Sequence, residues 1–164
     1  MRICFMYVSA SCMYVLHCIH IQISLAGLLC TSLERPNLHL QNLALEKLAE
    51  DYVYSSFTST VLAERLVPQL CKEACKNPEP IIKTQALYII SLVTWKLDES
   101  FVAGNILPSL KYIVDNERTA AVSMSVVGNY ESIGNSLGLT YIASSVLPVL
   151  QVLYVLSMCL FSLS

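Results

Sequence analysis

The chain has 164 residues, a formal net charge of −2 and a hydrophobic fraction of 55%, which is high for a soluble globular protein. This length permits one domain with its own core, and the small negative charge argues against a nucleic-acid-binding surface, which needs clustered basic residues. Seven cysteines in no regular framework argue against a secreted disulfide scaffold and favour a reducing, cytoplasmic compartment.

Both ends of the chain are strongly apolar. Of the 10 basic and 12 acidic residues, all except Arg2 lie between Glu34 and Glu131. Residues 3–30 are long enough to span a bilayer, which takes about 20 apolar residues, although His17, His20 and Gln22 interrupt them.

We therefore divide the chain into an apolar N-terminal segment (1–22), a central region (23–151) and an apolar C-terminal segment (152–164). Three interpretations of the ends remain open. They could be membrane or signal segments, with Arg2 preceding the first of them. They could be buried helices, or sequence foreign to the fold that a misjudged gene boundary has added.

The central region opens with a predicted helix. In "RPNLHLQNLALEKLAEDYV" (35–53), a proline turn precedes Leu38, Leu45 and Leu48, which recur at helical spacing. This stretch predicts an earlier half-repeat.

Three equally spaced prolines follow: Pro68, Pro108 and Pro148. Each has an aliphatic residue before it and a leucine two positions after it, and each predicted helix opens with Ser, Thr or Asp, which are good N-caps. A proline inside a helix removes a backbone donor and clashes with the carbonyl four residues back. The pattern therefore predicts the same bend in each repeated helix, with the carbonyls of Glu64, Gly104 and Ser144 freed.

A second helix follows each of the first two prolines, over residues 81–95 and 120–133. A shift by one proline interval places the apolar positions of one helix on those of the other: Ile82 on Val122, Ala86 on Val126, Leu87 on Val127 and Ile90 on Tyr130. The sequence thus predicts an all-α fold, an α-solenoid of stacked antiparallel helix pairs of the HEAT or armadillo kind with a period of about 40 residues.

The run from 65 to 150 also resembles a known family. The repeated "ILP" and "VLP" helices, "LDESFV" at 97–102 and "VVGNYESIG" at 126–134 resemble the HEAT-repeat region of the SCY-like pseudokinases, in the branch associated with clathrin-coated vesicles. The resemblance covers about residues 33–151. The Gly-rich loop and the V-A-I-K, H-R-D and D-F-G motifs of a kinase-like domain are missing from this sequence.

The resemblance implies a non-catalytic, protein-binding scaffold segment, part of a pseudokinase-type adaptor in clathrin or Golgi–endosome vesicle traffic. Its expected partners are coat or adaptor proteins, without cofactor, small-molecule substrate or nucleic acid. Its expected location is the cytoplasm, peripheral on Golgi, endosomal or clathrin-coated membranes. The alternative is a small helical membrane protein anchored by its apolar ends.

HEAT repeats commonly carry a polar ladder, in which an acidic residue or Asn is followed six positions later by a basic residue. Asn77 and Lys83 match this spacing, whereas Glu117 meets Ser123 in the next repeat. A continuous ladder is therefore not expected.

Two groups of residues have the composition of a metal site. Cys71 and Cys75 share a helix face, but a closed zinc site needs four ligands, so we expect buried free thiols there. Cys12 and His17 are a weaker pair of the same kind.

The remaining candidates have structural explanations. Glu50 and Asp51 are adjacent and point about 100° apart on a helix, and His39 has no evident nucleophile partner. Gly134 and Gly138 predict a helix stop and turn. We assign no catalytic, cofactor-binding or metal-binding residue.

Tyr88 and Trp95 lie seven positions apart and so share one helix face. We expect this face to pack in the core. The alternative is a partner-binding anchor, since such rings dominate interface energies.

Overall fold

The computed structural model describes the backbone of residues 2–138 and the side chains of residues 18–138. Over residues 2–138 the chain forms helices joined by short turns and contains no strand, which confirms the all-α prediction. The third proline, Pro148, and the C-terminal segment 152–164 lie outside the described residues.

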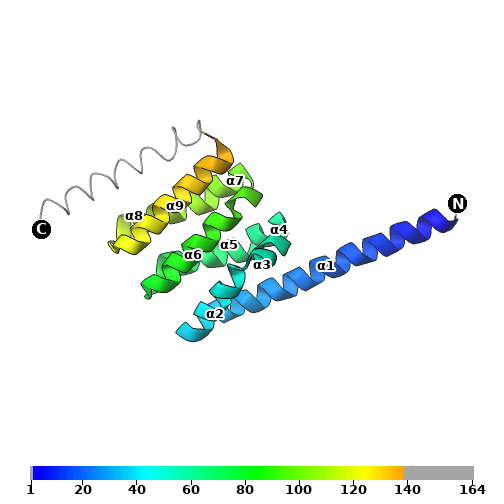
Figure 1. Ribbon diagram of the computed structural model, residues 1–164, viewed down its shortest axis with the longest axis horizontal. Coiled ribbons are helices and arrows are strands. Elements are labelled where there is room, and N and C mark those ends of the chain that lie inside the picture. The colour runs from blue at the N-terminus through cyan, green and yellow to red at the C-terminus, as the bar shows by residue number, and fades with distance from the viewer. Residues whose placement is uncertain (1, 139–164) are drawn as a thin grey trace, which may run out of the picture.

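The helices follow one another closely (Figure 1). In chain order they are α1 (Arg2–Glu34), α2 (Leu38–Leu48), α3 (Asp51–Ser56), α4 (Ser59–Val61), η1 (Leu62–Leu66), α5 (Val67–Lys76), α6 (Pro80–Val93), η2 (Thr94–Lys96), α7 (Glu99–Phe101), η3 (Val102–Ile106), α8 (Leu107–Asn116) and α9 (Ala120–Leu137). The first helix runs without a break across the predicted boundary between residues 22 and 23.

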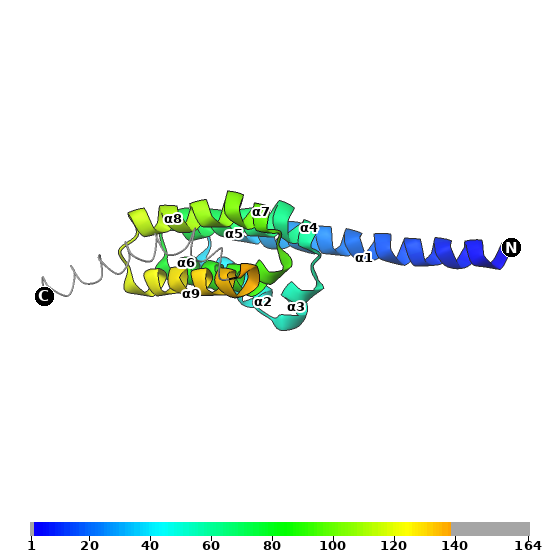
Figure 2. The same ribbon diagram turned by 90° about the horizontal axis from the view of Figure 1, so that it is seen from above.

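Two layers of helices lie face to face (Figure 2). The first layer contains α1, α4 to α5, and α7 to α8. The second layer contains α2, α3, α6 with η2, and α9. Helix α6 is central, since it packs against α2, α5 and α9.

The helices that carry Pro68 and Pro108 are equivalent along their whole length. The α4–η1–α5 helix spans residues 59–76 and the α7–η3–α8 helix spans residues 99–116, so both ends are shifted by the interval between the two prolines. In each, the five residues before the Val-Pro or Leu-Pro pair form a π turn: the Val67 N–H donates to the Leu62 carbonyl, and the Leu107 N–H donates to the Val102 carbonyl. The repeated distortion predicted from the prolines is therefore a widened helical turn, which makes room where the ring would meet the carbonyl of Glu64 or Gly104.

The second helices keep most of the predicted apolar pairs. Ile82 and Val122, Ala86 and Val126, and Ile90 and Tyr130 are all buried, whereas Leu87 is buried and Val127 only half-buried. The difference follows from position, because α6 has a neighbour on each side whereas α9 is the last helix that the structure describes.

The earlier half-repeat forms the helix α2, with one correction. The Asn37 side chain caps α2 by accepting from the Leu40 N–H, and Leu45 and Leu48 are buried. Leu38, which the spacing placed on the same stripe, is 48% exposed. Leu38 is the first residue of α2 and follows the turn from α1, so its side chain stays exposed at the end of the helix pair.

Candidate functional site

Aromatic side chains stand out from the second layer. Tyr88 on α6 is 54% exposed and Trp95 in η2 is 64% exposed. The prediction that they pack in the core is wrong. They do share a face, but this face of α6 points away from α5 and α9, so no described helix covers it.

Trp95 lies in a turn that several bonds hold in place. At the end of α6 the Ile90 carbonyl accepts from the Thr94 N–H and also from the Thr94 hydroxyl, the latter at 2.7 Å. The Lys96 ammonium donates to the carbonyls of Ser55 at 2.6 Å, Phe57 at 3.2 Å and Tyr54 at 3.4 Å. Lys96 therefore closes the C-terminal end of α3, where helix carbonyls lack partners of their own.

The same ammonium lies 5.2 Å from the centroid of the Trp95 ring. This distance is within the range of a cation–π contact. Lys96 thus links α3, the end of α6 and the exposed indole. Spacing arguments missed Lys96, because its partners are backbone carbonyls of a helix that is distant in the sequence.

Tyr54 on α3 lies next to this turn, since its carbonyl accepts from the Lys96 ammonium. The Asp51 carboxylate one turn earlier on α3, followed by burial, raises the pKa of Tyr54. Asp51 is exposed and Tyr54 is half-buried. We call Asp51, Tyr54, Tyr88, Trp95 and Lys96 the aromatic face.

The neighbouring helix leaves room beside this face. The positions of α9 that correspond to Ile81, Tyr88 and Trp95 are Ala121, Gly128 and Asn135, and all three are exposed. A methyl group added at Gly128 would meet no heavy atom within 4 Å.

Polar links join successive helix pairs between Gln41 and Glu117. The Asn77 amide donates to Gln41 of the preceding pair at 3.3 Å. Lys83 pairs with Glu117 of the following pair at 2.5 Å, and both side chains are largely buried. Lys83 therefore bonds to the following helix pair rather than to Asn77.

Cys71 and Cys75 are free thiols, Cys71 buried and Cys75 half-buried. Burial raises the pKa of Cys71 to about 11 and also raises that of Cys75. Among residues 18–138, no three His, Cys, Asp or Glu side chains are grouped so that they could hold a metal ion. The side chains of Cys12 and His17 lie outside the described residues.

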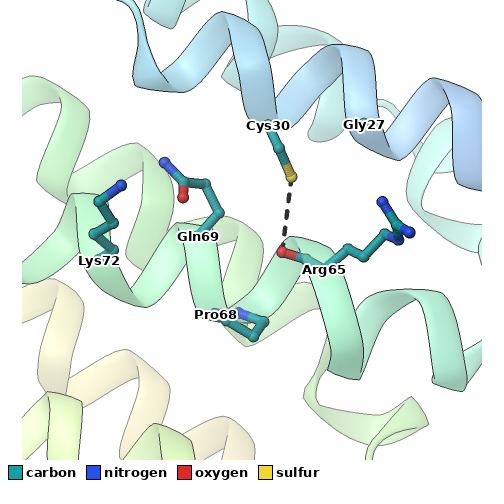
Figure 3. A pocket seen from close by; sticks show the side chains of 6 residues that line it. All are labelled: Gly27, Cys30, Arg65, Pro68, Gln69 and Lys72. Atoms are coloured by element: carbon teal, nitrogen blue, oxygen red, sulfur yellow. Dashed lines mark hydrogen bonds between the residues drawn. The ribbon is translucent and has the colours of Figure 1, made fainter.

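A cavity of about 360 Å³ lies between α1 and α5 (Figure 3). It is lined by Gly27, Cys30, Arg65, Pro68, Gln69 and Lys72. The Cys30 thiol donates to the Arg65 carbonyl at 3.7 Å, and burial raises its pKa. Cys30 is thus protonated at neutral pH and is not an activated nucleophile.

The other residues singled out in the sequence take separate places. The Glu50 carboxylate binds the Lys47 ammonium at 2.8 Å and accepts from the Tyr52 hydroxyl. Glu50 and Asp51 therefore do not form a pair of carboxylates around a common site. His39 is exposed. The helix stop falls at Gly138, which has a φ of 91°, while Gly134 lies buried inside α9.

Over the part of the chain with described side chains, no helix combines the length and the apolar character that crossing a membrane requires. The chain matches no protein-family model, no curated protein and no solved structure.

Proposed function

We propose that this chain is a non-catalytic scaffold segment, an α-solenoid of the HEAT kind, that binds a protein partner through its second layer. The support for the solenoid is the repetition in space: two helices one repeat apart have equivalent bounds and the same π turn, and each contacts the helix that follows it. Such helix pairs stack because none can bury its apolar face alone.

The observation that carries the binding proposal is the aromatic face. Tyr and Trp supply most of the energy in many interfaces, and their exposure in a rigid setting lowers the ordering cost of binding. Trp95 has such a setting, because Lys96 fixes the turn that carries it.

The resemblance to the SCY-like pseudokinases supports the finer part of the proposal. It suggests a place in vesicle traffic, with coat or adaptor proteins as partners, in the cytoplasm or on the surface of coated membranes. It rests on sequence features alone.

The test compares proteins captured from cells by the full chain and by two variants. We expect Tyr88→Ala with Trp95→Ala to lose a set of partners, coat or adaptor proteins among them, that the full chain retains. The matched control is Tyr112→Ala on α8, because Tyr112 is 50% exposed but lies in the first layer. Equal capture by all three chains, measured by quantitative mass spectrometry, contradicts binding through the aromatic face.

The membrane-anchored alternative has one observation in its favour. The N-terminal half of α1 extends beyond the helices that the rest of α1 packs against (Figure 1). Carbonate extraction separates the two proposals. A scaffold is released from membranes, whereas a membrane protein anchored by both apolar ends stays in the pellet.

A further inference from the structure

The exposed surface of α1 separates into two stripes. From position 18 onward, the exposed apolar side chains follow one line at spacings of three and four residues: Cys18, Ile21, Leu25 and Leu28. The exposed polar side chains before Glu34 follow another line: His20, Ser24 and Thr31. No described helix covers the apolar stripe, in which Leu28 is 67% exposed. An apolar stripe beside a polar one is typical of a helix that packs against another helix, whereas a helix buried in a bilayer is apolar all round.

The apolar stripe has the period of a coiled-coil seam. In the sequence, the alternation of three and four residues continues toward the N terminus through these positions: Cys4, Tyr7, Ser11 and Tyr14. Together with the four exposed positions they make four heptads, the repeat that allows two helices to pack along their whole length. We call positions 4, 7, 11, 14, 18, 21, 25 and 28 the α1 seam. It contains no charged residue and is apolar except for Ser11.

The shape of α1 indicates which partner fits the seam. The helix is unbroken over 33 residues, so it is about 50 Å long at about 1.5 Å per residue. Its C-terminal half packs against α2, η1 and α5, whereas its N-terminal half extends alone (Figures 1 and 2). The extending residues 2–17 are as long as residues 18–33, which carry the uncovered stripe. The same helix running in the opposite direction would therefore cover the stripe with its own extending half.

We propose that α1 forms an antiparallel coiled coil with α1 of a second copy of this chain. In this pairing, position 28 of one copy faces position 4 of the other, and position 25 faces position 7. Each extending half then lies along the stripe of the other copy, and the two stacks of helices lie at opposite ends of the coiled coil. The contact is isologous, so both copies use the same surface. The inference is independent of the aromatic face, because α1 belongs to the first layer.

The α1 seam is large enough for a stable dimer. Burying one large apolar side chain removes on the order of 100 Å² from water. Seven apolar seam positions therefore bury about 700 Å² per copy, within the range of about 600–1,000 Å² per partner that stable interfaces need. Because α1 is uncharged between Arg2 and Glu34, the two seams meet without burying an unpaired charge.

The first test measures the mass of the full chain by sedimentation equilibrium under reducing conditions, over the micromolar range. We expect twice the 18.2 kDa of one chain. Leu25→Glu with Leu28→Glu should weaken dimerisation about a hundredfold or more, because it places unpaired charges in the seam. The matched control is Met124→Glu on α9, since Met124 is 69% exposed and lies outside the seam. This control should remain dimeric.

The second test determines the direction of pairing by mild oxidation of Leu28→Cys. An antiparallel pair brings Cys4 of one copy to the introduced thiol at position 28 of the other, and peptide mapping should find this mixed disulfide. The two positions are about 36 Å apart within one helix, so the link can form only between copies. A disulfide between the Cys4 residues of two copies would instead show a parallel pair and overturn the antiparallel arrangement.

Two further results would overturn the proposal. One is a full chain that stays monomeric throughout the micromolar range, and a monomer that floats with phosphatidylcholine vesicles would show that a membrane surface covers the stripe instead. The other is a dimer that Leu25→Glu with Leu28→Glu leaves unchanged, which would place the contact elsewhere on the chain. Both substituted residues are exposed, so circular dichroism should show the same helix content in the charged variant and in the unchanged chain.

Discussion

Glu117 shows how one residue joins two helix pairs. One carboxylate oxygen accepts from Lys83 on α6, and the other accepts from the Thr119 hydroxyl and from the backbone N–H groups of Arg118 and Thr119 at the start of α9. The hydrogen bond from Lys83, followed by those from Thr119, lowers the pKa of Glu117 to about 2. The residue thus holds the turn between α8 and α9 and joins it to the preceding pair.

This lowered pKa predicts a pH dependence of stability. A carboxyl whose pKa is lower in the folded state stabilises the fold above its unfolded pKa of about 4.5, and the contribution is lost as the pH falls toward 2. Glu117→Gln should cost about 1–2 kcal/mol at pH 7, after allowance for solvent screening. The difference in free energy of unfolding between the two proteins, measured in urea, should shrink steadily from pH 6 to pH 2. A difference that stays constant over this range contradicts the ionic role of Glu117.

Gly128 predicts a change of the opposite sign. It lies inside α9, and a methyl group added there meets open space. Because glycine loses more backbone entropy than alanine when a helix forms, Gly128→Ala should stabilise the protein by about 0.5–1 kcal/mol. A rise in the thermal midpoint checks this, whereas a fall would show that the backbone of α9 needs glycine at this position.

Among the helical elements, the π turns are the repeated feature. Each lies between the first turn of its helix and a proline, and the first and last residues of each π turn are buried in the core: Leu62 and Leu66 in η1, Val102 and Ile106 in η3. Proline explains why a regular turn is disfavoured at these points. Core packing explains why both helices resolve the conflict in the same way, because the neighbouring helices are equivalent.

The short helix α3 depends on a single side chain from another element. Because Lys96 binds three carbonyls at its end, Lys96→Met should leave them without a charged donor and cost about 1–3 kcal/mol locally. We expect the amides of α3 (Asp51–Ser56) to exchange with solvent about tenfold faster or more, while those of α9 stay unchanged.

The control for this measurement is Lys72→Met. Lys72 pairs with Glu34 at 3.4 Å, and both side chains are more than half exposed, so its loss should have little effect. Equal exchange rates in α3 for both variants would show that Lys96 does not hold this helix.

Across the molecule as a whole, α6 is the centre of the stack (Figure 2). It contacts helices of the preceding pair, its own pair and the following pair. Two side-chain bonds fix it to α9: the Asn129 amide donates to the Leu87 carbonyl at 2.9 Å, and the Ser132 hydroxyl donates to the Ser91 carbonyl at 2.8 Å. In a stack of helix pairs, each pair is stabilised by its neighbours. A destabilising substitution in the central pair should therefore promote local unfolding of the pairs on both sides.

Leu87→Ala tests this arrangement. Leu87 is fully buried, and its truncation should cost about 2–5 kcal/mol. We expect faster amide exchange in α2, α5 and α9 together. Leu33→Ala, at an equally buried site near the end of α1, should accelerate exchange mainly in α1 and α2. If both variants accelerate the exchange of the same amides, the described helices unfold as one unit rather than one helix pair at a time.

Sequence patterning was enough to predict the helical class, the repeat interval and the equivalence of Pro68 and Pro108. These are local properties, since periodicity, caps and prolines act within a few residues of chain. The same patterning placed Tyr88 and Trp95 on one side of a helix. It did not foresee the π turns, because a proline states only that a regular turn is disfavoured.

Which side of each helix is covered depends on the packing of the whole chain. Spacing shows that Tyr88 and Trp95 share a face, but only the positions of α3, α5 and α9 show that this face is open. The same holds for the bonds of Lys83 with Glu117 and of Lys96 with Ser55 in α3, which join residues 34 and 41 positions apart. Contacts of this kind depend on how the helices stack. A single sequence shows which residues share a face of one helix, but it does not show which other helix lies against that face.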